Sequence, residues 1–478
     1  MPVFSLPSDQ SSGTLGSEAY RFVNFISRSG LTYWQILPLV PPDETGSPYR
    51  SCSAFAGGIG YIDPDILAGK APLSARSKAD DDSYADYKKS EQNISRLLKN
   101  EYKSFCGKKN RDFDIFCTEN AFWLDDYAEY SAIKEHFGNI PWYEWDDEIK
   151  FRDKAALDEL RKSLSCEIGY HKFCQFEFFR QWNMLKKYAA SKNVRIIGDI
   201  PIYVALDSAD VWAEPSLFLL DEELVPKLVA GVPPDMFSET GQLWGNPIYN
   251  WHEMEKQNFS WWKKRIRHNA MLCDMLRIDH FIGIVNYYAV PYGEPDATKG
   301  SWLNGPSMKL IEAINESCAD TLIIAEDLGV VSEAVKKVMK KSGYPGMRLM
   351  EFAFDDDASS KNLPHNFPKN CIVYGGTHDN ETLCGYFSHA KPKVISFAKE
   401  YLGVSKRSDI PWGIIKSAFK STAALAVFQM QDFLALDNFA RTNTPSTTEN
   451  NWCFRFGSED FSDELAAKIK KLVKISGR

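Results

Sequence analysis

No part of the sequence contains the run of about 18 or more apolar residues that a membrane-spanning helix requires. Residues 1–16 also lack the basic flank and apolar core of a secretory signal. Asp and Glu (64) outnumber Lys and Arg (56), so the basic excess of a phosphate-backbone binder is missing. We therefore expect a cytoplasmic protein that binds neither membranes nor nucleic acid. The composition does not indicate the oligomeric state.

The cysteines form no CxxC pair, although there are ten of them. They are scattered along the chain, as at Cys52, Cys174, Cys273, Cys371 and Cys453. Several stand beside apolar runs, which favours reduced thiols buried as small hydrophobic side chains. We expect no metal site and no cofactor.

Short apolar runs typical of buried strands alternate with helical patterns such as 332–341 and 412–434. The runs are 33–39, 194–199, 275–279, 322–326, 347–354, 371–375 and 452–456. This alternation predicts an α/β protein with a parallel sheet. A doubly wound open sheet is the alternative, but no G-x-G-x-x-G follows any run. We therefore predict a (β/α)₈ TIM barrel.

Residues 63–192 are charged and helix-like, with few strand candidates, and we expect them to form helical insertions between the early strands. Only about 20 residues follow Phe456, too few for a separate β domain. The expected organisation is one catalytic barrel over residues 1–478, with no separate C-terminal β domain.

Several predicted strands end in an acid, and a barrel carries its active site at the carboxyl ends of its strands. In an extended strand Arg277 and Asp279 point to one face, whereas Ile278 and His280 point away. A neighbouring guanidinium keeps a carboxylate ionised, which suits a nucleophile. A structural ion pair would have the same pattern.

Three further acids are candidates for catalytic roles. Glu326 ends an apolar run, and a carboxyl against apolar walls has the raised pKa of a general acid. A solvated acid at a strand end is the other interpretation. Asp379 follows paired glycines and His378, which is equally compatible with a buried structural histidine. Asp199 ends another run.

In order along the chain, these segments resemble the motifs of the amylomaltase, or disproportionating enzyme, family of 4-α-glucanotransferases. The similar segments are 46–57 (GSPYRSCSAFAG), 198–212 (GDIPIYVALDSADVW), 231–246 (GVPPDMFSETGQLWGN), 277–280 (RIDH), 325–329 (AEDLG), 377–380 (THDN), 440–445 (ARTNTP) and 451–452 (NW). The sequence departs from the family pattern at Ser446, where Pro-Gly is common, and before Gly16, where the chain is short.

The resemblance implies a retaining glucanotransferase in which Asp279 is the nucleophile, Glu326 the general acid/base and Asp379 the transition-state stabiliser. It implies maltooligosaccharides and α-1,4-glucans as donors and acceptors. The implied sugar-binding residues are Ser47, Tyr49, Asp199, Phe237, Trp244, Asn246, Arg277, His378 and Asn380.

The aromatic loop 233–244 is expected to fold over the cleft and exclude water. Two alternatives stay open at this point. An α-amylase-type hydrolase would usually add calcium and a C-terminal β-sandwich. A non-catalytic glucan-binding protein would have lost its acids, whereas this sequence retains all three.

Overall fold

The strands of the central α/β unit form two parallel sheets. The computed structural model describes residues 1–73, 84–235, 238–318, 320–329, 331–355 and 357–478. One sheet has the order β1 (Tyr33–Gln35), β2 (Arg195–Ile200), β5 (Met275–Ile278) and β8 (Leu322–Ala325). The other has the order β11 (Leu425–Val427), β10 (Cys371–Tyr374) and β9 (Gly346–Leu349). The predicted α/β class is confirmed.

The two sheets share one buried interior, which is a TIM-barrel-like arrangement. Its side chains are Ile197, Met275, Ile324, Met347, Leu349, Ile372 and Tyr374. The sheets also contact each other through polar groups, since Tyr374 Oη lies 3.0 Å from Gln35 Oε1 and Ala325 N donates to Pro345 O at 3.0 Å. Side chains of both sheets therefore pack together as one core.

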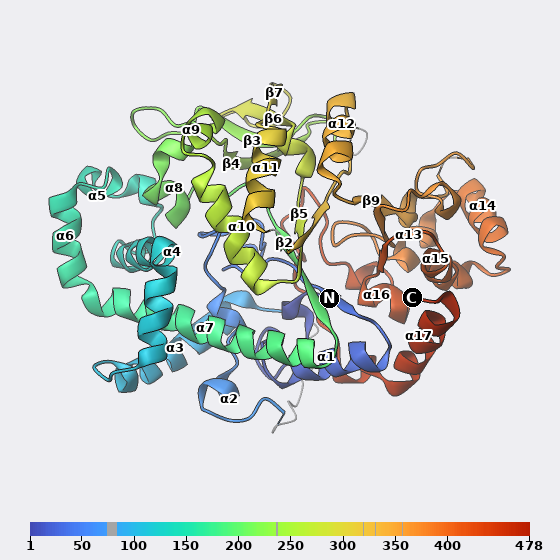
Figure 1. Cartoon of the computed structure of the whole chain (residues 1–478), viewed down its shortest axis with the longest axis horizontal. Helices are drawn as coiled ribbons and strands as arrows, with labels where there is room; N and C mark the ends of the chain where they lie inside the picture. Colours follow the sequence, from blue (N-terminus) through green and yellow to red (C-terminus); the bar gives the residue numbers. More distant parts are fainter. Residues whose placement is uncertain (74–83, 236–237, 319, 330, 356) are drawn as a thin grey trace.

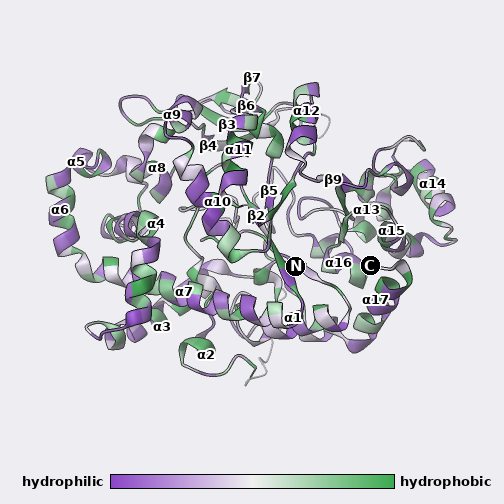
Figure 2. Ribbon diagram, viewed as in Figure 1, coloured by the Kyte–Doolittle hydropathy of each residue, from purple (hydrophilic) through white to green (hydrophobic). Residues whose placement is uncertain are grey.

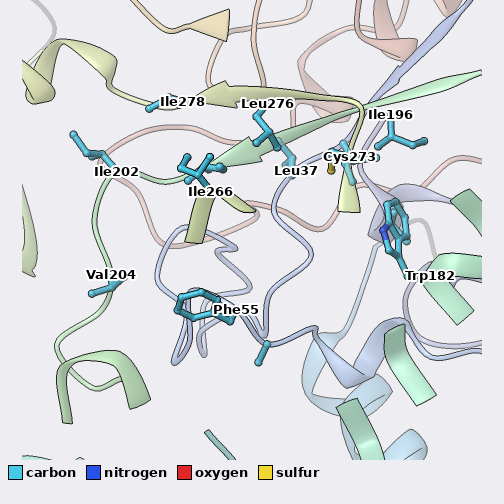
Figure 3. Close-up of a cluster of buried hydrophobic side chains, with 14 of the residues drawn as sticks. Leu37, Phe55, Trp182, Ile196, Ile202, Val204, Ile266, Cys273, Leu276 and Ile278 are labelled. Atoms are coloured by element: carbon cyan, nitrogen blue, oxygen red, sulfur yellow. The ribbon is translucent and has the colours of Figure 1, made fainter. Parts of the chain in front are cut away.

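A second apolar layer lies between the strands and the covering helices. Figure 3 shows Ile196 and Leu276 in this layer, with Ile196 next to Trp182 of α7 (Ser165–Ser191). Ile196 faces the helices and its neighbour Ile197 faces the sheet interior, and both are 0% exposed. Burial on both faces explains why these strands read as unbroken apolar runs. Figure 2 shows the hydrophobic colours gathering on the central strands.

Helices fill most of the segment between β1 and β2 and lie at the left and along the bottom of Figure 1. They are α2 (Pro64–Leu67), α3 (Tyr87–Phe105), α4 (Arg111–His136), α5 (Asp147–Lys150), α6 (Lys154–Ser163) and α7. The remaining helices are α1 (Ser17–Arg28), α8 (Ala209–Ala213), α9 (Trp251–Lys256), α10 (Ser260–Leu272), α11 (Met308–Ser317), α12 (Glu333–Ser342), α13 (Leu383–His389), α14 (Pro392–Leu402), α15 (Ile410–Phe419), α16 (Met430–Leu434) and α17 (Asp463–Ser476).

An antiparallel sheet that the sequence did not predict lies at the top of Figure 1. Its order is β4 (Gln242–Pro247), β3 (Leu228–Val232), β6 (Asn286–Pro291) and β7 (Ser301–Asn304). Part of the predicted loop 233–244 therefore belongs to β4, which pairs with β3. Gly241, with φ of 69°, allows this turn, because a Cβ there would lie 2.4 Å from Val232 O.

Two sequence predictions about the C-terminal part were wrong. The helix expected over 412–434 is interrupted by β11, because residues 425–427 pair in parallel with β10 and tertiary context overrides their helix propensity. The strand expected over 452–456 is reduced to an isolated bridge between Phe454 and Tyr84. Trp452 has φ of 60°, which breaks the extended conformation.

The N-terminal segment and the residues before α17 hold each other in place. Phe456 N donates to Ser5 O at 2.9 Å, and Arg455 Nη2 donates to Ser8 O at 2.6 Å. Among the described residues, no helix is both long and apolar enough to cross a membrane. All ten cysteines are free; Cys273 and Cys371 are buried as predicted, whereas Cys106 and Cys166 are exposed.

Candidate active site

A cavity of about 540 Å³ lies at the carboxyl ends of β5 and β8. Asp279, Glu326 and Asp379 all line it. The first two directly follow β5 and β8, and Asp379 follows β10 after a short turn. Because neighbouring parallel strands end at the same edge, acids placed just beyond them meet in one cleft.

Asp279 is held by a buried cation. Arg277 Nη2 lies 2.7 Å from Asp279 Oδ1, and Arg277 Nη1 lies 2.6 Å from Asp199 Oδ2. The parallel register pairs Asp199 with Arg277, and Tyr49 Oη donates to Asp199 Oδ2 at 2.6 Å. Arg277 and Asp199 are 3% and 4% exposed and do not line the cavity. They therefore orient Asp279 and Tyr49 from behind its wall.

Glu326 is 7% exposed, and two backbone amides fix its orientation. His280 N donates to Oε2 at 2.8 Å and Leu328 N donates to Oε1 at 2.6 Å. Burial raises the pKa of Glu326 to about 8, and the charge of Asp279 adds to the rise, whereas Arg277 and the two amides oppose it. The carboxyl is therefore mainly protonated at neutral pH, as a general acid must be.

Asp379 is the most open of the three acids, since 44% of its side chain is exposed. Asn443 Nδ2 donates to its Oδ1 at 2.6 Å, and His378 Nε2 lies 3.4 Å from its Oδ2. Arg441 Nη2 donates to the Asp379 carbonyl at 2.6 Å. Residues far along the chain thus fix both the backbone and the carboxylate of Asp379.

Aromatic rings form part of the cavity wall. Tyr49 stacks on His378, with 5.1 Å between the ring centroids. The ring centroid of Trp452 lies 5.6 Å from that of Tyr49 and 5.5 Å from that of His378. On another side, Trp244 meets His280 edge to face at 4.9 Å. Flat rings with polar edges suit the apolar faces and hydroxyl edges of sugars.

The prediction that His280 points away from the acids was wrong, because His280 lines the cavity. The alternation of side chains ends with β5 at Ile278, and His280 has a left-handed conformation with φ of 48°.

The other predicted sugar-binding residues fall into three groups. Ser47, Trp244 and Asn246 line the cavity, and Asn246 Nδ2 also donates to Val204 O at 2.8 Å. Asn380 does not line it; its Oδ1 instead accepts from Thr377 N and Oγ1, both at 2.8 Å, and so shapes the turn before Asp379. Phe237 lies outside the described residues.

The cavity residues that were not predicted as site residues include Tyr203, Gln242, Asn443 and Trp452. Each stands inside a segment that carried the family resemblance, which is the one signal that pointed to them. Within the described ranges, no group of three or more His, Cys, Asp or Glu side chains is arranged to hold a metal ion.

Comparisons with known proteins agree with this geometry. The 4-alpha-glucanotransferase family model matches residues 1–459. A 4-alpha-glucanotransferase of Clostridium butyricum is 44% identical over 485 residues, with 100% of both chains covered. One of Aquifex aeolicus (strain VF5) is 42% identical, with 100% of this chain and 98% of the relative covered.

Solved structures give the same result. Amylomaltase from Streptococcus agalactiae in complex with acarbose has a TM-score of 0.95 at 39% identity, with 100% of this chain and 98% of that chain covered. An amylomaltase from Corynebacterium glutamicum shares the fold, with a TM-score of 0.78 at 16% identity, over 99% of this chain and 74% of that chain. The resemblance seen in the sequence is confirmed, and the chain belongs to the 4-alpha-glucanotransferase family.

Proposed function

We propose that this protein transfers α-1,4-glucan segments between maltooligosaccharides or longer α-glucans. The observation that carries the proposal is one cavity containing an arginine-paired Asp279, a buried Glu326 whose pKa is raised, and Asp379. The full-length similarity to 4-alpha-glucanotransferases supports the reaction class.

The proposed chemistry is a retaining double displacement. Asp279 attacks the anomeric carbon, and Glu326 gives its proton to the departing glycosidic oxygen. The resulting glycosyl ester on Asp279 is then attacked by an acceptor hydroxyl, whose proton returns to Glu326. Asp379 binds sugar hydroxyls and stabilises the oxocarbenium-like transition state. This mechanism predicts that the Asp279 and Glu326 carboxyls lie roughly 5–6 Å apart when poised to react.

We assign sugar contacts to Ser47, Tyr49, Trp244, Asn246 and His378, since these residues line the cavity around the acids. Asp199, Arg277 and Asn380 act through their neighbours as positioning residues. We further propose that residues 1–478 form one closed (β/α)₈ catalytic barrel with residues 63–192 as a helical insertion. The interior shared by both parallel sheets supports this organisation.

Incubation with maltotriose alone tests the function. Transfer produces glucose and a ladder of longer maltodextrins while the total of reducing ends stays constant, because each cleaved bond is replaced by another. A steady rise in reducing ends, with no product longer than maltotriose, would identify a hydrolase. A glucan-binding protein without activity would change neither measure.

A further inference from the structure

The turn that carries His378 and Asp379 into the cavity rests on two buried carboxyl groups. Glu351 belongs to the short 3₁₀ helix Met350–Phe352, directly after β9, and Asp432 belongs to α16. Each of the two acids is 1% exposed. Neither lines the catalytic cavity, and neither takes part in the proposed double displacement. Their burial beneath the catalytic turn points to a different role.

Both carboxyl groups contact the part of the turn that precedes Asp379. A Cβ at Gly376 would lie 3.2 Å from Glu351 Oε2, and a Cβ at Gly375 would lie 2.9 Å from Asp432 Oδ2. The Glu351 backbone amide also donates to Gly375 O at 2.9 Å. The paired glycines therefore allow the two carboxyl groups to approach the backbone of the turn closely.

The same carboxyl groups hold the part of the turn that follows Asp379. The backbone amide of Glu381 donates a hydrogen bond to the Glu351 carboxyl. Leu383 N donates to Asp432 Oδ1 at 2.8 Å. Each buried acid therefore connects the residues before Asp379 with the residues after it, and the two acids together support the turn.

The surroundings of Glu351 favour its neutral form. Burial raises the pKa of Glu351 to about 9. The negative charges of Glu381 and Asp432 add to this rise, whereas the positive charge of Arg441 opposes it. Tyr386 of α13 is a further titratable group close to Glu351. Among the described residues, Glu351 Oε2 has no hydrogen-bond partner, so a negative charge on it would be poorly compensated.

Ionisation of Glu351 would reach Asp379 by two routes. Arg441 Nη2 donates to the Asp379 carbonyl at 2.6 Å, and Arg441 Nε donates to Asn443 O at 2.8 Å. A negative charge on Glu351 attracts this guanidinium and repels Glu381, which belongs to the turn itself. Both effects weaken the contacts that orient Asp379.

We propose that Glu351, as a neutral carboxylic acid, is a positioning residue that holds Asp379 in its catalytic orientation, and that its ionisation at alkaline pH loosens the turn. Asp432 shares the support of the turn. The inference rests on the proposed glucanotransferase function, since Glu351 acts on the reaction only through Asp379.

The test measures fluoride release from α-maltosyl fluoride, a donor that needs little proton donation from Glu326. For the wild type, kcat/KM should fall about tenfold between pH 8 and pH 10, because the neutral fraction of a group with a pKa of about 9 falls by that factor. Glu351→Gln is neutral at every pH, so its kcat/KM should change less than about twofold over the same range.

A second pair of variants separates positioning from packing. Glu351→Leu should lower kcat about tenfold at pH 7 with little change in KM, because leucine cannot accept the Glu381 hydrogen bond. Glu351→Gln, which can accept it, should recover most of that loss. Glu129→Gln is the matched control, since Glu129 is 5% exposed and paired with Arg161 but lies on α4 and does not line the cavity. This control should keep the wild-type pH dependence.

An alkaline decline of wild-type size in folded Glu351→Gln would overturn the inference, and so would a wild-type profile that stays flat to pH 10. If Glu351→Leu does not fold, the pH profile of Glu351→Gln still decides. Failure of the proposed function has a different signature, because the wild type would then make no ladder from maltotriose. Thermal denaturation at pH 8 and pH 10 checks that folded proteins are compared.

Discussion

The backbone amide of His280 donates a 2.8 Å hydrogen bond to the carboxyl group of Glu326, so the residue after Asp279 orients the second acid. The bond forms because His280 leaves the strand in a left-handed conformation. The relative position of the two acids is consequently fixed by main chain as well as by side chains.

Asp279→Asn should lower transfer from maltotriose by about a thousandfold or more, because the amide cannot form the glycosyl ester. The fold should persist, since Arg277 keeps its bond to Asp199 at 2.6 Å. Initial rates measure the transfer activity and thermal denaturation measures the stability of the fold. Calorimetry with maltoheptaose measures whether substrate binding is retained. Near-normal turnover by the folded variant would exclude Asp279 as the nucleophile.

Glu326→Gln should reduce activity with maltotriose far more than formation of the glycosyl-enzyme from an α-glucosyl fluoride, which needs little protonation to depart. In the wild type, kcat/KM for maltotriose should decline as pH rises through the Glu326 pKa of about 8, because the proton-donating form is lost. Equal losses on both donors, or a flat profile from pH 7 to 9, would argue against the general-acid role.

Trp244→Ala should raise the share of hydrolysis relative to transfer. Trp244 lines the cavity and packs against His280, so its loss opens the site to water and removes a surface for the acceptor. The share is measured as new reducing ends per glucose released from maltotriose. Trp302→Ala is the control, because Trp302 lies on β7 of the same sheet and is 46% exposed. If Trp244→Ala and Trp302→Ala both give the wild-type ratio of new reducing ends to glucose, Trp244 does not favour transfer over hydrolysis.

Glu351→Gln should stabilise the protein increasingly as pH rises from 6 to 9. Burial raises the pKa of Glu351 to about 9, with Glu381 and Asp432 adding to the rise and Arg441 opposing it. Between the ordinary value of 4.5 and about 9, the folded state holds a proton that the unfolded state has released, so stability falls as pH rises.

Because glutamine cannot ionise, the Glu351→Gln variant should lose the part of the decrease in stability with pH that Glu351 causes. Melting temperatures at pH 6, 7, 8 and 9 check the prediction, with exposed Glu400→Gln as the control. Parallel curves for Glu351→Gln and the wild type would show that Glu351 does not hold its proton in the folded state.

Ser446→Gly should stabilise the protein by about 0.5–1 kcal/mol, because a left-handed residue costs more with a Cβ than without one. Ser446 has φ of 65°, which gives a physical reason for the glycine common in the family at this position. Urea denaturation compares Ser446→Gly with Ser446→Ala, which retains the Cβ. If Ser446→Gly is no more stable than Ser446→Ala, the left-handed conformation at this position does not strain a residue that has a Cβ.

The sequence predicted the parts of the site that local pattern determines. Asp279 and Glu326 stand at the ends of apolar runs, and the side-chain period of two placed Arg277 beside Asp279. It missed β11 and the β4-β3-β6-β7 sheet, because alanine-rich and Gly/Pro-containing segments become strands only through partners distant in sequence. Asn443 and Trp452 were missed as site residues for the same reason, since their link to Asp379 and His378 exists only in the folded chain.

The contacts that residues 441–456 make have a consequence for how the enzyme matures. All three acids have been synthesised by residue 379, but Asp379 gains its amide and guanidinium donors from Asn443 and Arg441. The segment that supplies them is then tied to Ser5 and Ser8 at the opposite end of the chain. During translation, a ribosome-bound chain therefore contains the three acids well before it has a finished cleft, because the cleft needs residues 441–456 in place.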